Sequence, residues 1–153
     1  MENLSITLTS KQINVQHALD FIQSNDCGAQ SIFIGTTRSN EIDDTTNKTI
    51  VQFLFYEAYE KMAIKLMNEI VKDQLKSFDL ENKYRIYVCH RIGLVPLGEA
   101  SIVIAVSSPH RDGHQVVMNI LNEIKKKVPI WKRVHFENDE EDWSRNSEAF
   151  WLN

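Results

Sequence analysis

The residues best suited to chemistry are cations gathered between His110 and His135. Six lysine and arginine residues fall in this stretch against two acidic ones, although the chain of 153 residues has a net charge of −4. A local basic block in an acidic chain predicts an anionic small ligand or a short acidic partner, whereas nucleic-acid-binding domains are usually basic throughout. The six cations are Arg111, Lys125, Lys126, Lys127, Lys132 and Arg133.

Some of these cations lie where the chain enters or leaves a predicted element. His110 and Arg111 precede a predicted helix, whose unpaired backbone N–H groups and dipole favour a phosphate or carboxylate. Arg38 follows a predicted strand, and Gly35 just before it allows a ligand to approach the backbone. Each cation alone is more typical of a solvated surface. Together they lead us to expect that Arg38, Arg111 and Lys132 form one anion pocket.

The helix that follows Arg111 ends in three lysines, and its phase separates them. Its apolar residues recur at helical spacing and predict one buried stripe. At about 100° per residue, Lys126 points away from the stripe, whereas Lys125 and Lys127 flank it and Lys125 can lean into a neighbouring cleft. The alternative is a basic last turn that merely stabilises the helix C-terminus. The stripe consists of Val117, Ile120, Leu121, Ile124 and Val128.

Other chemistries have little support. There is no glycine-rich phosphate loop, HExxH motif or nucleophile elbow, and Ser107–Ser108 near His110 lack a third group to complete a hydrolytic triad. The two cysteines, Cys27 and Cys89, are 62 positions apart and predict free thiols in a reducing compartment. His90–Arg91 is expected to end a strand at the surface.

Nothing in the sequence predicts a membrane span or a targeting signal. The longest aliphatic run, Ile102 to Val106, is far shorter than the roughly 20 residues that a membrane helix needs. The N-terminus lacks the basic and apolar pattern of a secretion or transit signal. We therefore expect a cytoplasmic protein that binds neither membranes nor nucleic acid.

The elements that must position the cations follow one another without a repeat or a linker, so we expect one domain over residues 1–153. Strand pairs occur without an intervening helix, which favours an α+β fold with a mostly antiparallel sheet. A polar loop is expected over 36–48, a turn region around Gly93, Pro96 and Gly98, and an irregular acidic tail over about 137–153. Strands are expected at Leu4–Leu8, Ser31–Gly35, Ile50–Tyr56, Tyr84–His90 and Ser101–Ser107, and helices at 15–22, 57–78 and 112–127, the last ended by Pro129.

Five motifs occur in the order and spacing typical of one family. Together they resemble the large, catalytic subunit of molybdopterin synthase over about residues 30–145. The seven-residue spacing from Lys125 to Lys132 is part of this resemblance. The motifs are Phe33–Arg38, Tyr56–Ala63, His90–Gly93, Ser107–Arg111 and Lys125–Arg133.

The resemblance implies a fold, partners and a reaction. Members fold as an α/β hammerhead with an added antiparallel sheet and form a central homodimer within a heterotetramer. Each large subunit receives the C-terminal Gly-Gly tail of a small ubiquitin-like sulfur carrier, which arrives as a thiocarboxylate. Its sulfur goes to cyclic pyranopterin monophosphate, and two rounds give the dithiolene of molybdopterin. The large subunit needs no metal or organic cofactor.

The resemblance also implies roles for residues of this chain. Lys125 is expected to be the main catalytic cation, by stabilising developing charge or by transferring a proton, with Lys132 as a second catalytic cation. The substrate pocket is expected to be lined by Thr36, Thr37, Arg38, His110 and Arg111, by Lys125 itself, and at its far wall by Lys132, Arg133 and Val134.

Two positions depart from the family pattern. Val134 stands where many members have Glu, so only a backbone contact remains possible there. Ser147 stands where members often carry an Arg thought to reach the neighbouring subunit's site, and Arg145 lies two residues earlier.

Two other classes of function compete with this one. A non-catalytic docking module for a ubiquitin-like protein would keep the carrier surface without turnover, but the presence of both Lys125 and Lys132 argues against it. A small RNA-binding domain would need exposed aromatics among its cations, and only Trp131 qualifies.

Overall fold

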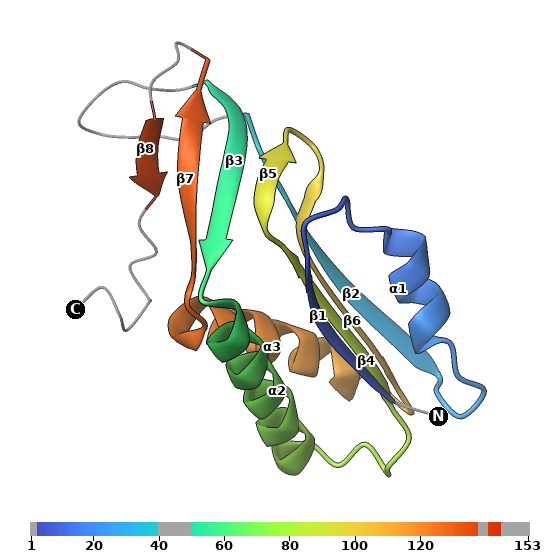
Figure 1. Ribbon diagram of the computed structural model, residues 1–153. Helices are drawn as coiled ribbons and strands as arrows, with labels where there is room; N and C mark the ends of the chain where they lie inside the picture. The colour runs from blue at the N-terminus through green and yellow to red at the C-terminus, as the bar shows by residue number, and fades with distance from the viewer. Residues whose placement is uncertain (1–2, 40–49, 138–140, 145–153) are drawn as a thin grey trace.

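The computed structural model describes residues 3–39, 50–137 and 141–144. Within these residues three helices accompany two four-stranded sheets (Figure 1). The helices are α1 (Val15–Ile22), α2 (Glu60–Ser77) and α3 (Asp112–Lys127). The strands are β1 (Leu4–Thr9), β2 (Ala29–Thr36), β3 (Val51–Ala58), β4 (Arg85–Arg91), β5 (Gly93–Pro96), β6 (Ala100–Ser108), β7 (Ile130–Phe136) and β8 (Glu141–Ser144).

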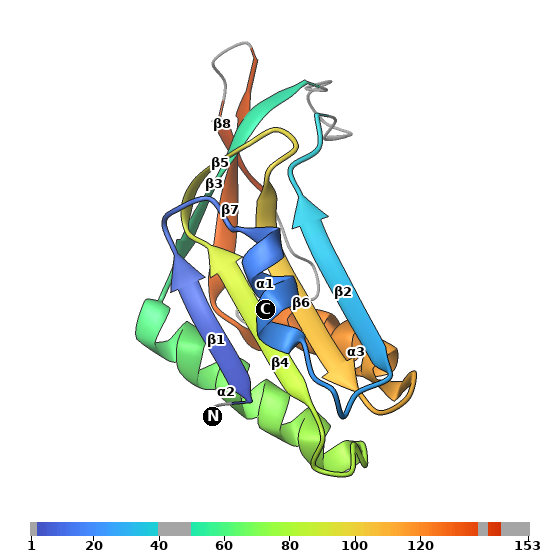
Figure 2. The same cartoon turned by 90° about the vertical axis from the view of Figure 1, so that its right-hand side faces the viewer.

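The first sheet has the strand order β1-β4-β6-β2, and only the β1–β4 pair is parallel. Helix α1 covers one face, and α2 and α3 cover the other (Figure 2). Every residue of β6 is buried, as expected for a central strand covered on both faces. The mixed helix and sheet content and the mostly antiparallel pairing confirm the predicted α+β class.

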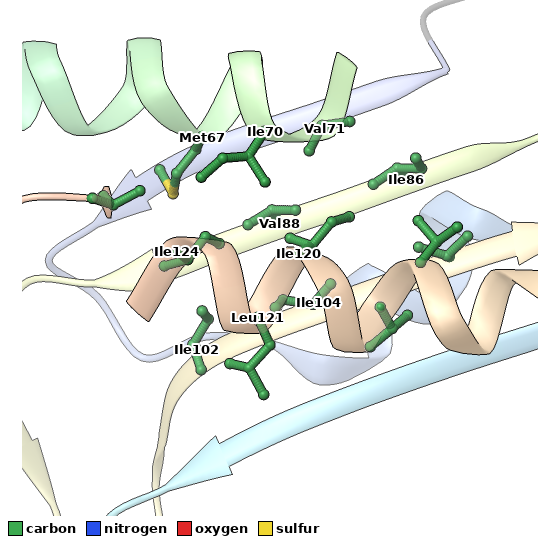
Figure 3. Close-up of a cluster of buried hydrophobic side chains, with 14 of the residues drawn as sticks. Met67, Ile70, Val71, Ile86, Val88, Ile102, Ile104, Ile120, Leu121 and Ile124 are labelled. Atoms are coloured by element: carbon green, nitrogen blue, oxygen red, sulfur yellow. The ribbon is translucent and has the colours of Figure 1, made fainter. Parts of the chain in front are cut away.

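The main core lies between this sheet and the two long helices. Ile120, Leu121 and Ile124 of α3 face the strands, as their helical spacing predicts (Figure 3). Ile102 and Ile104 of β6 meet them from the sheet. This packing lays α3 back along β6, so that Lys125 to Lys127 lie toward the beginning of β6 and Asp112 lies near its end.

The second sheet has the strand order β5-β3-β7-β8 and is antiparallel throughout. Strand β4 of the first sheet passes into β5 through Ile92 alone, and Gly93 has a φ of 91° at this bend. Positive φ is the conformation that glycine adopts at least cost. One chain segment therefore connects the two sheets directly.

The sequence missed three strands. β5 was expected to be a turn region, β7 was not predicted after Pro129, and β8 falls in the stretch predicted to be an irregular tail. The long helix begins at Glu60 rather than at Glu57, because β3 continues to Ala58. Most of the predicted 36–48 loop and of the acidic tail, including Arg145 and Ser147, lies outside the described residues.

Among the helices of residues 3–39 and 50–137, none combines the length and the apolar composition that a bilayer crossing needs.

Candidate functional site

Lys125 and Lys132 flank the turn that joins α3 to β7. Lys125 is exposed in the last helical turn, and Lys132 is half-buried in the third position of β7. Between them, Pro129 accepts a hydrogen bond of 3.2 Å from the N–H of Tyr59, at the start of α2. The ring of Tyr59 meets Trp131 at a centroid distance of 5.1 Å. The turn between the two lysines is thus anchored to a second element.

Successive side chains of β7 point to opposite faces, so Lys132 and Arg133 lie on opposite sides of the second sheet. Lys132 lies opposite Tyr56 in the β3–β7 register, on the same side as the buried Val134. Arg133 lies on the other side, with its guanidinium carbon 5.4 Å from the centroid of the Phe55 ring. The predicted far wall of the pocket is therefore divided between two faces of the sheet.

Val134 is poorly placed for any contact with a ligand. Its side chain is 1% exposed and packs in the small core of the second sheet. Its backbone lies between β3 and β8, in register with Leu54 and Asp142. The sheet also uses the backbone groups of a central strand, and the predicted place of Val134 at the far wall of the pocket stays a prediction.

The face that carries Lys132 meets the first sheet at His90. The rings of Tyr56 and His90 are in edge contact, with centroids 4.9 Å apart. His90 and Arg91 end strand β4 as predicted, but they are 7% and 9% exposed, so the prediction that they lie at the surface is wrong. Their burial depends on Tyr56 of β3, which packs against His90, and on Glu99 of the following turn, which pairs with Arg91, and neither contact is evident from the sequence around this pair.

The segment leaving β2 carries the next three predicted residues. Thr36 is exposed and Arg38 is exposed, whereas Thr37 between them is 3% exposed. Among the described residues the buried hydroxyl of Thr37 has no hydrogen-bond partner. In this segment Arg38 is therefore the residue that can present a charge to a ligand.

His110 and Arg111 are both exposed in the short connection from β6 to α3. The hydroxyl of Ser108 organises this connection, because it donates to the carbonyl of His110 and accepts a 3.2 Å hydrogen bond from the N–H of Gly113. One of the free N–H groups that the sequence offered to an anion is therefore already satisfied within the chain.

Arg38 and Arg111 lie at opposite ends of the first sheet. In the antiparallel β2–β6 register, Thr36 pairs with Ala100 and Ala29 pairs with Ser108. At roughly 3.3 Å per residue, these ends are about 25 Å apart. The expectation that Arg38, Arg111 and Lys132 share one pocket therefore fails for a single chain.

A polar pocket elsewhere contains none of the predicted residues. Its volume is about 710 Å³, and its lining includes Asn25, Asn82 and Arg85. These residues belong to the loops after α1 and before β4, together with the start of β4. No arrangement of catalytic groups distinguishes this pocket. The turn between Lys125 and Lys132 therefore remains the candidate site.

Comparisons with known proteins agree with the motifs. The chain matches the family described as MoaE protein over residues 8–127. A molybdopterin synthase catalytic subunit from Taeniopygia guttata is 42% identical over 149 residues, covering 97% of this chain and 91% of the relative. A molybdopterin synthase catalytic subunit 1 from Aedes aegypti is 42% identical over 149 residues, covering 95% and 92%.

Solved structures share the fold. Molybdopterin synthase from Staphylococcus aureus has a TM-score of 0.79 at 27% identity, and the match covers 95% of this chain and 98% of that one. A chain from the complex of subunits 1 and 2 of the Helicobacter pylori molybdopterin-converting factor has a TM-score of 0.68 at 15% identity, covering 97% and 94%. The resemblance seen in the motifs is confirmed. The chain belongs to the MoaE family, in which its similar relatives are catalytic subunits of molybdopterin synthase.

Proposed function

We propose that this chain transfers sulfur from the C-terminal thiocarboxylate of a small ubiquitin-like carrier to cyclic pyranopterin monophosphate, giving the dithiolene of molybdopterin. The observation that carries the proposal is the pair Lys125 and Lys132 on either side of one anchored turn. Both the carrier tail and the cyclic phosphate are anionic, so two cations at one turn match both reactants.

In each round a carbon–sulfur bond replaces a carbon–oxygen bond on the pterin. The leaving group is the phosphate oxygen in one round, which opens the cyclic phosphate, and water in the other. The acyl carbon–sulfur bond of the carrier breaks by hydrolysis, so that one water molecule per round supplies the oxygen of the carboxylate that the carrier tail becomes. Lys125, at the exposed end of α3, stabilises the negative charge that develops in this exchange. Lys132 binds the substrate from the sheet side and contributes a second positive charge.

The pocket is completed in a homodimer. Within one chain, the strand end that precedes Arg38 lies about 25 Å along the sheet from the strand end that precedes Arg111. We propose that His110 and Arg111 of a second copy face the end of the first copy at which Arg38, Lys125 and Lys132 lie. Two copies related by a twofold axis would then form two equivalent sites.

The other partners follow from the same proposal. The Helicobacter pylori structure is of a complex between two subunits, which supports a small-subunit partner for this chain as well. A heterotetramer of two large and two small subunits gives each site one carrier tail. The free Cys27 and Cys89 suit the reducing cytoplasm, where we place the enzyme.

Reconstitution tests the proposal. The protein is mixed with a thiocarboxylated carrier and cyclic pyranopterin monophosphate, and the dithiolene product is detected by mass spectrometry. Product formation is expected only when all three are present. Binding of the carrier without any product would instead identify a docking module without turnover.

A further inference from the structure

The chain between β5 and β6 forms a tight turn over residues 96–99. The N–H of Glu99 donates to the carbonyl of Pro96 at 3.2 Å, and Gly98 has a φ of 78°. Positive φ at the third position, without positive φ at Leu97 before it, is typical of a type II turn and favours glycine at the third position. The turn therefore has a fixed backbone shape.

This turn holds the segment that leaves β2. The N–H of Thr37 donates to the carbonyl of Glu99 at 3.1 Å, and the N–H of Gly98 donates to the carbonyl of Thr37 at 2.9 Å. Two residues further on, the carbonyl of Ser39 accepts a 2.7 Å hydrogen bond from the N–H of Val51. Arg38 thus has an exposed side chain on a backbone that is anchored on both sides. The 96–99 turn and the segment that follows β2 therefore lie side by side (Figures 1 and 2).

An ion pair to the first sheet holds the 96–99 turn in place. Nη1 of Arg91, the last residue of β4, lies 2.7 Å from a carboxylate oxygen of Glu99, and the two side chains are 11% and 29% exposed. Within the described part of the chain the buried Nε of Arg91 has no hydrogen-bond partner, which leaves the Glu99 carboxylate to orient the guanidinium. Loss of either partner would leave a poorly solvated charge and release the turn.

We infer that Arg91 and Glu99 are positioning residues for Arg38. The ion pair fixes the turn, the turn fixes Thr37, and Thr37 sets where the Arg38 guanidinium meets an anionic substrate. The inference rests on the proposed function, in which Arg38 binds the pterin phosphate. Neither Arg91 nor Glu99 needs to touch the substrate, and their effect passes through the backbone of one residue.

A double-mutant cycle with Arg38→Ala tests this pathway. Glu99→Gln keeps the size of the side chain but removes its charge, and it should raise the KM for the pterin by about tenfold while kcat stays within about twofold. A displacement of a binding group by about 1 Å is sufficient for an effect of this size. In the Arg38→Ala background, Glu99→Gln should change KM no further, because the residue that it positions is gone.

Two further variants distinguish a positioning effect from a general loss of stability or activity. Arg91→Lys keeps the positive charge but loses the forked geometry, so it should raise KM less than Glu99→Gln does. Glu69→Gln breaks the exposed Lys65–Glu69 pair on α2, whose charged atoms are 4.0 Å apart, and should leave kcat and KM unchanged. If Glu99→Gln melts below the assay temperature, Arg91→Lys is carried through the same cycle with Arg38→Ala.

The outcomes separate the inference from the proposed function. If Arg38→Ala leaves KM unchanged, the proposed role of Arg38 in binding fails. If Arg38→Ala raises KM but the ion-pair variants do not, or if the two effects multiply independently, the positioning inference is overturned. Loss of the ion-pair effect in the Arg38→Ala background supports it.

Discussion

The ring of Tyr56 in β3 meets the ring of His90 in β4 edge-on, with an interplanar angle of 70°. Nδ1 of His90 lies 2.8 Å from the carbonyl oxygen of Arg91, so it carries the proton of the neutral ring. Burial lowers the pKa of His90 to about 4, and the contact with the Arg91 carbonyl offsets this only in part. The two sheets therefore meet across a histidine that is neutral at physiological pH.

This burial predicts a loss of stability in mild acid. Between pH 6.5 and about 4 the unfolded chain binds a proton at His90 that the folded chain does not, so the free energy of unfolding falls as the pH falls. The contribution is on the order of 3 kcal/mol across the window. His90→Gln should flatten the dependence in urea denaturation at a series of pH values. His114→Gln, at an exposed position of α3, controls for removal of a histidine, and identical slopes for wild type and His90→Gln would refute the assignment.

Lys125 and Lys126 are neighbours at the exposed end of α3 and form a matched pair. Lys125→Ala should reduce dithiolene formation on the order of 100-fold or more, as loss of a charge-stabilising group does. Lys126→Ala should retain most activity. Each change should alter stability by no more than about 0.5 kcal/mol, because both residues are exposed. The rates come from the thiocarboxylate assay and the stabilities from thermal melts. Equal rates in the two variants would mean that Lys125 is not the catalytic lysine.

The separation of Arg38 from Arg111 predicts complementation between subunits. Arg38→Ala and Arg111→Ala homodimers should each be weakly active. A mixed dimer, formed by co-expression with two different tags, should recover activity at one of its two sites, since one site then receives both arginines. The measurement is the rate per mixed dimer after tandem purification. A mixed dimer as inactive as its parents would argue against a pocket built from two chains.

Gly113 permits the close approach of α3 to the end of β6. A Cβ at this position would clash with the hydroxyl oxygen of Ser108 and come within 3.1 Å of Ser108 Cβ and 3.2 Å of Val106 Cγ1. Gly113→Ala should therefore destabilise the protein by roughly 1–3 kcal/mol, although alanine favours helices over glycine. Urea denaturation measures the change. The penalty should shrink in a Ser108→Ala background, where the hydroxyl no longer opposes the new methyl group, and an unchanged penalty would show that Ser108 is not the obstacle.

The sequence predicted well those elements that bury one face, because burial of one face gives a regular hydrophobic pattern. The stripe from Val117 to Val128 is buried as expected, because a 3.6-residue period specifies a helix lying on a core. Strand β7 has no such pattern, because Lys132 and Arg133 place charges on both of its faces. Strand β5 has only four residues, and its Gly93 and Pro96 are typical of turns.

The sequence predicted which residues belong to the candidate site, and their roles stay predictions, but it did not predict how these residues are arranged. The register of β2 against β6 places Arg38 and Arg111 far apart. The residues of either strand alone do not predict this register. The burial of Arg91 likewise depends on Glu99, which reaches it from the following turn. Local patterns identify candidate cations, whereas long-range pairing decides which of them can meet.

The alternation of β7 has a consequence for how this protein can change in evolution. A single inserted or deleted residue between Pro129 and Lys132 would exchange the sides of every following side chain, turning Lys132 outward and Arg133 toward the first sheet. A change of two residues would restore the sides but shift each group by about 6.6 Å along the strand. The spacing between the two lysines is therefore expected to resist length variation far more than the identity of the residues between them.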